Sequence, residues 1–282
     1  MSLSTLSDEL LAGLQSGEVI PYLGPGVLQG VTDQADGSAI PADSDSLIYA
    51  MTGGQAMAPR LMYEFPRAAM HMENKKGRNF IEHFLTKTYG QRKWSASGFH
   101  QWLAKLNLPY VIDCNRDTQL QELYADRAHT LVVGAARIAA TPYRFDIYEW
   151  RDNAYVAVTL DQVNTSLPVL FKPLGTPMPK PSFVASDADF VDYITELMGG
   201  FAVPSWIKQL RVGKRYLFLG MRFNRDTERM VMSEIIYGAN ADAGWAFINE
   251  PNEKEKRFCA RKHIQIVEAD GHVLPGLNAN AA

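Results

Sequence analysis

The sequence predicts an α/β protein with a mostly parallel sheet, a helical insert at about 46–108 and a small antiparallel β insert at about 130–170. Short apolar segments typical of buried strands recur along the chain, and helical patterns separate most of them. The last part alternates regularly, with a helix expected at 226–237, a strand at 245–248, a helix at 251–261 and a strand at 263–267. Such alternation favours a parallel sheet covered by helices.

The first strand is expected directly before a glycine turn. Ser7, followed by leucines at helical spacing, predicts a short capped helix that ends at Gly17. The apolar segment 19–23 then predicts a buried strand, which breaks directly into Gly24-Pro25-Gly26. A strand that ends in a glycine turn is how a nucleotide-binding α/β domain usually begins.

The middle of the chain contains both inserts and a second strand with a polar end. Helical periodicity between 46 and 106 predicts the helical insert, and the strand at 110–112 ends in the polar run 113–117. Open α/β sheets bind their ligands at such carboxyl ends. Strands at 130–133, 143–150 and 154–160, with a hairpin turn at 151–153, predict the β insert. Strands at 168–171 and 216–220 and helices at 187–198 and 205–210 complete one expected domain, 1–282.

Composition indicates which classes of partner are disfavoured for this protein and in which cell compartment it is expected. Lys plus Arg total 28 against 31 for Asp plus Glu, which disfavours nucleic acid or an anionic membrane as the main partner. We find no apolar run of about 18 residues that would predict a membrane span and no pattern of a secretory signal. Two cysteines in 282 residues make no disulfide framework. These features predict a cytoplasmic protein.

Four segments, taken in order, resemble the SIR2 (sirtuin) superfamily, particularly its divergent bacterial SIR2-like branch. Residues 19–27 resemble the strand and glycine turn that hold the NAD pyrophosphate. Residues 99–104 with 111–118 resemble the helix that leads into an Asn-x-Asp-Thr segment. Residues 171–175 resemble a strand ending in Lys-x-His-Gly, and 217–226 resemble the late strand and turn near the adenosine ribose.

The resemblance implies a SIR2-like, Rossmann-type fold and a pocket for NAD. It places Gly24, Gly26, Asn115, Asp117 and Gly220 as candidate cofactor-binding residues of one vestigial cleft. Because Pro25 has no N–H to offer a phosphate, we expect NAD to bind weakly at most. Simpler interpretations remain open: the glycines as a tight turn only, and Asn115 and Asp117 as helix caps.

Departures from the family pattern predict a protein without catalytic residues. The resemblance implies a catalytic His at the position of Leu174, which can neither accept nor donate a proton. Cys114 stands where the family has Gln and, lacking a nearby His, is expected to be a packed residue more often than a nucleophile. The segment after Ile40-Pro41 lacks Asp-Phe-Arg, and the turn has no following Ser or Thr. We therefore expect a pseudoenzyme; the alternative is an NAD hydrolase or NAD-dependent deacylase.

No metal site is expected. The six histidines show no ligand spacing with Cys, Asp or Glu, and two cysteines cannot build a four-thiolate zinc ribbon. His100 is interpreted as a structural residue, and the methionines between 51 and 72 as core residues or, alternatively, as a partner-facing surface.

A protein partner is the expected ligand of such a chain. Over its whole length the sequence resembles the SIR2-like accessory proteins of nitrogen-fixing bacteria, which implies the nitrogenase molybdenum-iron protein, or an immature form of it, as partner. Side chains alternate between the faces of a hairpin, so Arg144, Tyr148 and Trp150 share one face, which we expect to be free for partner binding. A second candidate surface is the segment 57–72. On this hypothesis, alanine at Tyr148 and Trp150 weakens capture without unfolding the protein.

Overall fold

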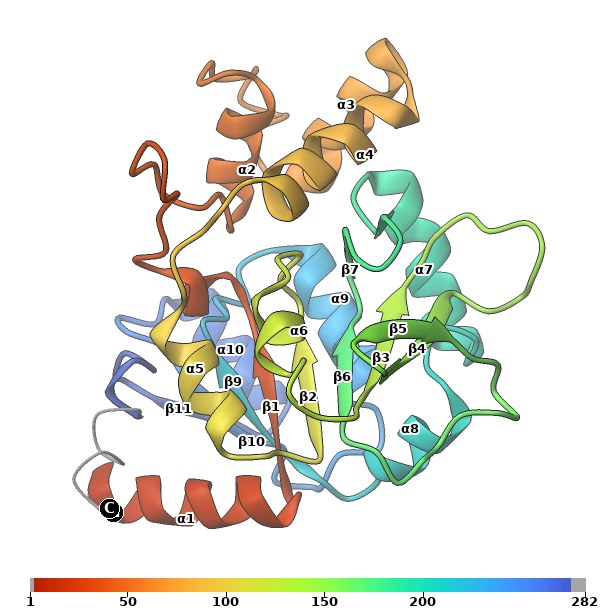
Figure 1. Cartoon of the computed structure of the whole chain (residues 1–282). Coiled ribbons are helices and arrows are strands. Elements are labelled where there is room, and N and C mark those ends of the chain that lie inside the picture. The colour runs from red at the N-terminus through yellow and green to blue at the C-terminus, as the bar shows by residue number, and fades with distance from the viewer. Residues whose placement is uncertain (1–2, 275–282) are drawn as a thin grey trace.

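The computed structural model describes residues 3–274 and contains one large twisted sheet (Figure 1). Its strand order is β11-β10-β9-β1-β2-β6-β3-β4-β5. The parallel strands are β1 (Val19–Leu23), β2 (Tyr110–Asp113), β3 (Thr130–Gly134), β6 (Val169–Lys172), β9 (Arg215–Leu219), β10 (Gly244–Phe247) and β11 (Ile264–Val267). The antiparallel strands β4 (Phe145–Arg151) and β5 (Ala154–Ala157) complete one edge. The predicted fold class is confirmed.

Helices cover both faces of this sheet. On one face lie α1 (Leu3–Ser16), α5 (Gly98–Lys105) and α6 (Gln119–Leu123), and on the other α7 (Asp187–Gly199), α8 (Ser205–Leu210), α9 (Asp226–Ile235) and α10 (Glu253–Arg261). Alternate strand residues feed the two cores: Leu217 and Leu219 pack in the first, Tyr216 and Phe218 in the second. This is the period of two that a strand imposes on its side chains.

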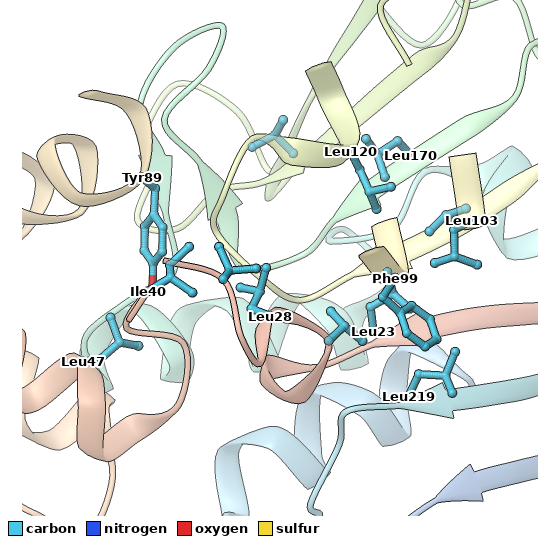
Figure 2. Close-up of a cluster of buried hydrophobic side chains, with 14 of the residues drawn as sticks. Leu23, Leu28, Ile40, Leu47, Tyr89, Phe99, Leu103, Leu120, Leu170 and Leu219 are labelled. Atoms are coloured by element: carbon cyan, nitrogen blue, oxygen red, sulfur yellow. The ribbon is translucent and has the colours of Figure 1, made fainter. Parts of the chain in front are cut away.

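The remaining helices lie beyond the carboxyl ends of the strands. They are α2 (Ser44–Met51), α3 (Phe65–Lys76), α4 (Arg78–Thr86) and the short turns η1 (Pro25–Leu28) and η2 (Lys87–Gln91) (Figure 1). The first core reaches up to them, from Phe99 and Leu219 past Leu28 to Leu47 (Figure 2). Arg78 also connects this layer to the rest of the domain by donating to the Phe183 carbonyl at 2.9 Å.

The β insert differs from its prediction in one respect. β3 pairs in parallel with β6 and thus belongs to the main sheet, while β4 and β5 extend that sheet by antiparallel pairing. The hairpin turn is confirmed, because Asp152 and Asn153 lie between β4 and β5 with φ of 51° and 61°. Such positive φ values at both central residues suit a two-residue hairpin loop. A separate two-stranded sheet pairs β7 (Gly175–Thr176) with β8 (Ser182–Phe183).

The helices within residues 3–274 are too short or too polar to cross a membrane.

Candidate functional site

The glycine turn after β1 meets the turn after β9 at the carboxyl edge of the sheet. The Gly26 N–H donates to the Gly220 carbonyl at 2.9 Å, and a Cβ added to Gly26 would lie 2.7 Å from the Gly220 Cα. Gly220 has a φ of +69°, and its own added Cβ would lie 2.5 Å from the Val27 nitrogen. Both positions therefore require glycine for the contact between the two turns, whatever ligand is bound.

The residues after β2 lie at the same edge but turn into the protein. The Asn115 side-chain amide donates to the Gly24 carbonyl at 3.1 Å and to Asp113 Oδ1 at 2.9 Å. Asp117 accepts the Gln119 N–H at 2.9 Å, close to the start of α6. Asp117 thus holds the first N–H of α6 from the position before the N-cap residue Thr118, and Asn115 ties β2 to the glycine turn.

A buried ion pair completes this connection between strands. Lys172 Nζ on β6 donates to Asp113 Oδ2 at 2.6 Å, and both side chains are fully buried. Asp113 Oδ1 accepts the backbone and side-chain N–H groups of Asn115. The ion pair, the amide and the Gly24 carbonyl form one hydrogen-bonded series across β6, β2 and β1.

Two neighbouring cavities open at this edge. The larger has a volume of about 610 Å³ and is bordered by the glycine turn, α2, the turn after β9 and residues 270–272. The smaller, of about 60 Å³, lies between Tyr22, Cys114, Leu174 and Phe190. The walls of the two have five residues in common: Pro25, Ala42, Ser44, Met221 and Glu228.

The predicted cleft is only partly formed. Gly26 and Gly220 line the larger cavity, whereas Gly24, Asn115 and Asp117 line neither of the two. The expectation that all five residues line one cleft is therefore wrong. The Asn115 amide and one carboxylate oxygen of Asp117 are held by hydrogen bonds within the protein, which a strand-end motif does not reveal. A role for these five residues in cofactor binding stays a prediction.

The glycine turn does not fit the pyrophosphate of NAD. The N–H of Gly24 donates to the Leu219 carbonyl at 2.8 Å, that of Gly26 to Gly220, and that of Val27 to the Gly24 carbonyl at 3.3 Å. Pro25 has no N–H. Phosphate binding at such turns depends on free backbone donors, and this turn has none between residues 24 and 27.

The smaller cavity lacks a strong nucleophile. Leu174 forms part of its wall beside Cys114, and burial raises the pKa of the Cys114 thiol to about 12. The thiol is therefore protonated at neutral pH, and only the thiolate is reactive. This favours the interpretation of Cys114 as a packed residue. Arg116, in the same wall, donates to the Val184 carbonyl at 2.7 Å and is buried.

Glu228 is the residue of this site that the sequence analysis missed. It lies in the wall common to both cavities, and burial, reinforced by Glu64 and Asp43, raises the pKa of its carboxyl to about 7 against the opposing effect of Arg225 and Arg229. Acidic residues are common in the first turn of any helix, where they complement the helix dipole. Its position in α9 therefore gave no signal in the sequence.

The proposed partner-binding face is not free. Arg144 pairs with Asp192 at 2.6 Å, Tyr148 is 9% exposed, and the Trp150 indole N–H donates to the Ala125 carbonyl at 2.9 Å. The expectation of a free face is wrong because β4 is not the edge strand and both of its faces are covered. Phe145 and Ile147 join one core, and Tyr148 joins the other.

Other expectations have simpler outcomes. Met51 and Met72 are buried, which favours the core interpretation of the methionine-rich segment. His100 is fully buried, and its Nδ1 lies 4.0 Å from Asp117 Oδ1. Between residues 3 and 274, no three His, Cys, Asp or Glu side chains are grouped so as to hold a metal ion.

Comparison with known proteins places the chain in a family. A family model of the SIR2-like domain matches residues 109–267, more than half of the chain and the whole stretch from β2 to β11. A search of curated proteins finds no match. The match agrees with the Rossmann-type sheet. The chain belongs to the family of SIR2-like domains.

Proposed function

We propose that this protein is a non-catalytic SIR2-like accessory protein that acts by recognising a protein partner. The observation that carries the proposal is the residue type at position 174, in the wall of the smaller cavity. Where the resemblance implies a proton-accepting His, the smaller cavity has the side chain of Leu174. General acid–base catalysis needs a group there that exchanges protons near neutral pH, and an alkyl side chain has none.

The state of the glycine turn supports the same proposal. Residues 24–27 use their backbone donors within the protein, so the strongest phosphate-binding element of a dinucleotide site is missing. A domain that keeps the sheet and both cores but loses these elements is suited to binding through its surface.

The proposed partner is the nitrogenase molybdenum-iron protein, during its assembly, protection or repair. This rests on the resemblance of the whole chain to nitrogenase-associated factor T. The described surface offers an apolar patch for such a contact, which replaces the face first expected on β4. We call it the α7 patch, defined as Tyr143, Val191, Met198 and Phe201.

The α7 patch combines residues from two parts of the chain. Val191 and Met198 lie seven positions apart and share one face of α7, where they are 69% and 70% exposed. The Tyr143 and Phe201 rings lie 6.2 Å apart. The Arg144 N–H donates to the carbonyl of Phe201, which follows the end of α7. Exposed apolar and aromatic side chains of this kind are typical centres of protein interfaces.

We predict that Val191→Lys with Met198→Lys weakens capture of the purified molybdenum-iron protein at least about tenfold, because a charge at the centre of an apolar interface must be desolvated. The measurement is capture on immobilised full-length chain at graded partner concentrations. The unfolding midpoint should change little, since both side chains are exposed.

The matched control is Val212→Lys with Tyr237→Lys, two apolar side chains that are 65% and 72% exposed on other elements. This pair should leave capture unchanged. Capture that survives the α7 changes places recognition elsewhere, and a wild-type chain that captures no molybdenum-iron protein refutes the proposed partner.

A further inference from the structure

Arg116 is a buried cation that has no carboxylate partner. The residue lies in the wall of the smaller cavity and is 7% exposed. Within residues 3–274 it forms no ion pair; one terminal N–H donates to the Val184 carbonyl at 2.7 Å, and Nε has no hydrogen-bond partner. A guanidinium stays protonated in proteins. Its positive charge is therefore present and largely withdrawn from water.

The carboxylate that attracts this charge is already shared by two other arginines. Asp189 pairs with Arg78 at 2.5 Å and with Arg137 at 2.7 Å, and Arg78 also repels Arg116. Burial lowers the pKa of Arg116, and the attraction of Asp189 offsets this effect only in part. A buried charge without a partner is strongly destabilising, so an anion that reached Arg116 would relieve that cost.

Arg211 shows how the protein compensates another buried guanidinium. It is 8% exposed and donates to the carbonyls of Glu234 and Ile235 in the last turn of α9, where the helix carries partial negative charge. Arg116 has only the Val184 carbonyl and the ring of Phe65, whose centroid lies 5.6 Å from its guanidinium carbon. Arg116 thus keeps the capacity to bind a further acceptor.

The smaller cavity has room for an anion of only a few atoms. Its volume is about 60 Å³, and one water-sized probe takes about 10–15 Å³, which leaves space for about four non-hydrogen atoms. Ser44 adds a hydroxyl that accepts the Phe65 N–H and whose own hydrogen has no acceptor within residues 3–274. Much of the remaining wall is apolar and includes Leu47, Phe65, Leu174, Phe190 and Val231.

We propose that the smaller cavity binds a short-chain monocarboxylate such as acetate, with its oxygens on Arg116 and its alkyl group against the apolar wall. The donors of a guanidinium form a planar fork that matches the two oxygens of a carboxylate. This ligand has no base, ribose or phosphate, so its binding does not depend on the glycine turn. The site is distinct from the α7 patch and requires neither a protein partner nor turnover.

Glu228 makes this binding depend on pH. Its carboxyl lies in the wall of the same cavity, and burial raises its pKa to about 7. Once ionised it repels a bound carboxylate, so the affinity should fall as the pH rises through 7. The neutral fraction of Glu228 drops from about nine tenths at pH 6 to about one tenth at pH 8, which lowers the affinity up to about tenfold. The charged and titratable groups that face Glu228 are Arg225 and Arg229 of the α9 region, Glu64 before α3, Asp43 before α2, Tyr22 on β1 and Cys114 after β2.

The test is calorimetric titration of the full-length chain with acetate, acetamide and chloride, at constant ionic strength and in a buffer free of carboxylates. Acetamide has the shape of acetate without its charge. At pH 6 we expect acetate to bind in the millimolar range or more tightly, and at least about tenfold more tightly than acetamide. Arg116→Gln should lower the acetate affinity at least about tenfold, because the charge-assisted hydrogen bonds are lost.

Three further variants isolate the contact. Arg211→Gln removes a guanidinium that is equally buried but lies in the wall of neither cavity, and it should bind acetate like the wild type. Leu174→Phe fills the smaller cavity and keeps Arg116, so it should also weaken binding, and it serves as the test if Arg116→Gln does not fold. Glu228→Gln should bind acetate like the wild type at pH 6 and show no pH dependence.

The proposal is overturned if acetate does not bind, if acetamide or chloride binds at least as tightly as acetate, or if a folded Arg116→Gln or Leu174→Phe variant keeps wild-type affinity. None of these results depends on partner capture or on NAD turnover, so the proposed function is tested separately.

Discussion

Lys172→Met lowers the free energy of unfolding by about 3–5 kcal/mol, the usual cost of removing one partner of a buried ion pair. Lys172 and Asp113 are both fully buried and lie 2.6 Å apart. Methionine fills similar space but leaves the Asp113 carboxylate with only the N–H groups of Asn115 as partners. Because Asn115 also holds the Gly24 carbonyl, the loss should loosen the glycine turn.

Urea unfolding of Lys172→Met measures this loss of stability. Two further variants serve as controls for the buried charge. Lys172→Met combined with Asp113→Asn removes both charges and should recover part of the loss. Lys214→Met, whose partner Glu18 is 64% exposed, should change the free energy of unfolding far less than Lys172→Met does, because solvent screens an exposed pair. A loss below about 1 kcal/mol for Lys172→Met would show that the pair is not buried as described.

Tyr148→Ala with Trp150→Ala should lower the free energy of unfolding by about 4–6 kcal/mol. Tyr148 packs in the first core, and the Trp150 ring lies 4.9 Å from that of Tyr155 and donates to the Ala125 carbonyl. Truncating a buried aromatic residue commonly costs about 3–5 kcal/mol, and neighbouring sites do not add fully.

Thermal and urea unfolding measure this loss, with Tyr237→Ala as the control for an aromatic residue that is 72% exposed. The control should stay within about 0.5 kcal/mol of the wild type. A stable double variant would contradict the burial of β4 and restore its outer face as a candidate partner surface.

Local patterns in the sequence were sufficient for most of the fold. Runs of apolar β-branched and aromatic residues located β1, β2, β6 and β9, and the Asp152-Asn153 turn was visible because these residues tolerate positive φ. The parallel pairing of β3 with β6 was not visible, since the order of strands depends on contacts between distant segments. Alternation in β4 separated two sets of side chains but could not show that both would be covered.

The sequence predicted only the part of the site whose geometry follows from the order and direction of the strands. The meeting of Gly26 and Gly220 follows from two parallel strands that end at the same edge. Asn115 and Asp117 turn inward because of local hydrogen bonds, and the residue types alone do not show which partners these side chains choose. The position of Glu228 at the two cavities depends on how α9 packs on the sheet and on α7, and a single glutamate in a helix carries no such information.

Release of nicotinamide from NAD by the purified full-length protein tests the central claim most directly. It is measured with the protein alone and with the molybdenum-iron protein, beside a Leu174→His variant. The account predicts background release in every case, because the histidine alone does not restore the missing phosphate donors or the absent Asp-Phe-Arg segment. Robust turnover by the wild type would contradict the claim.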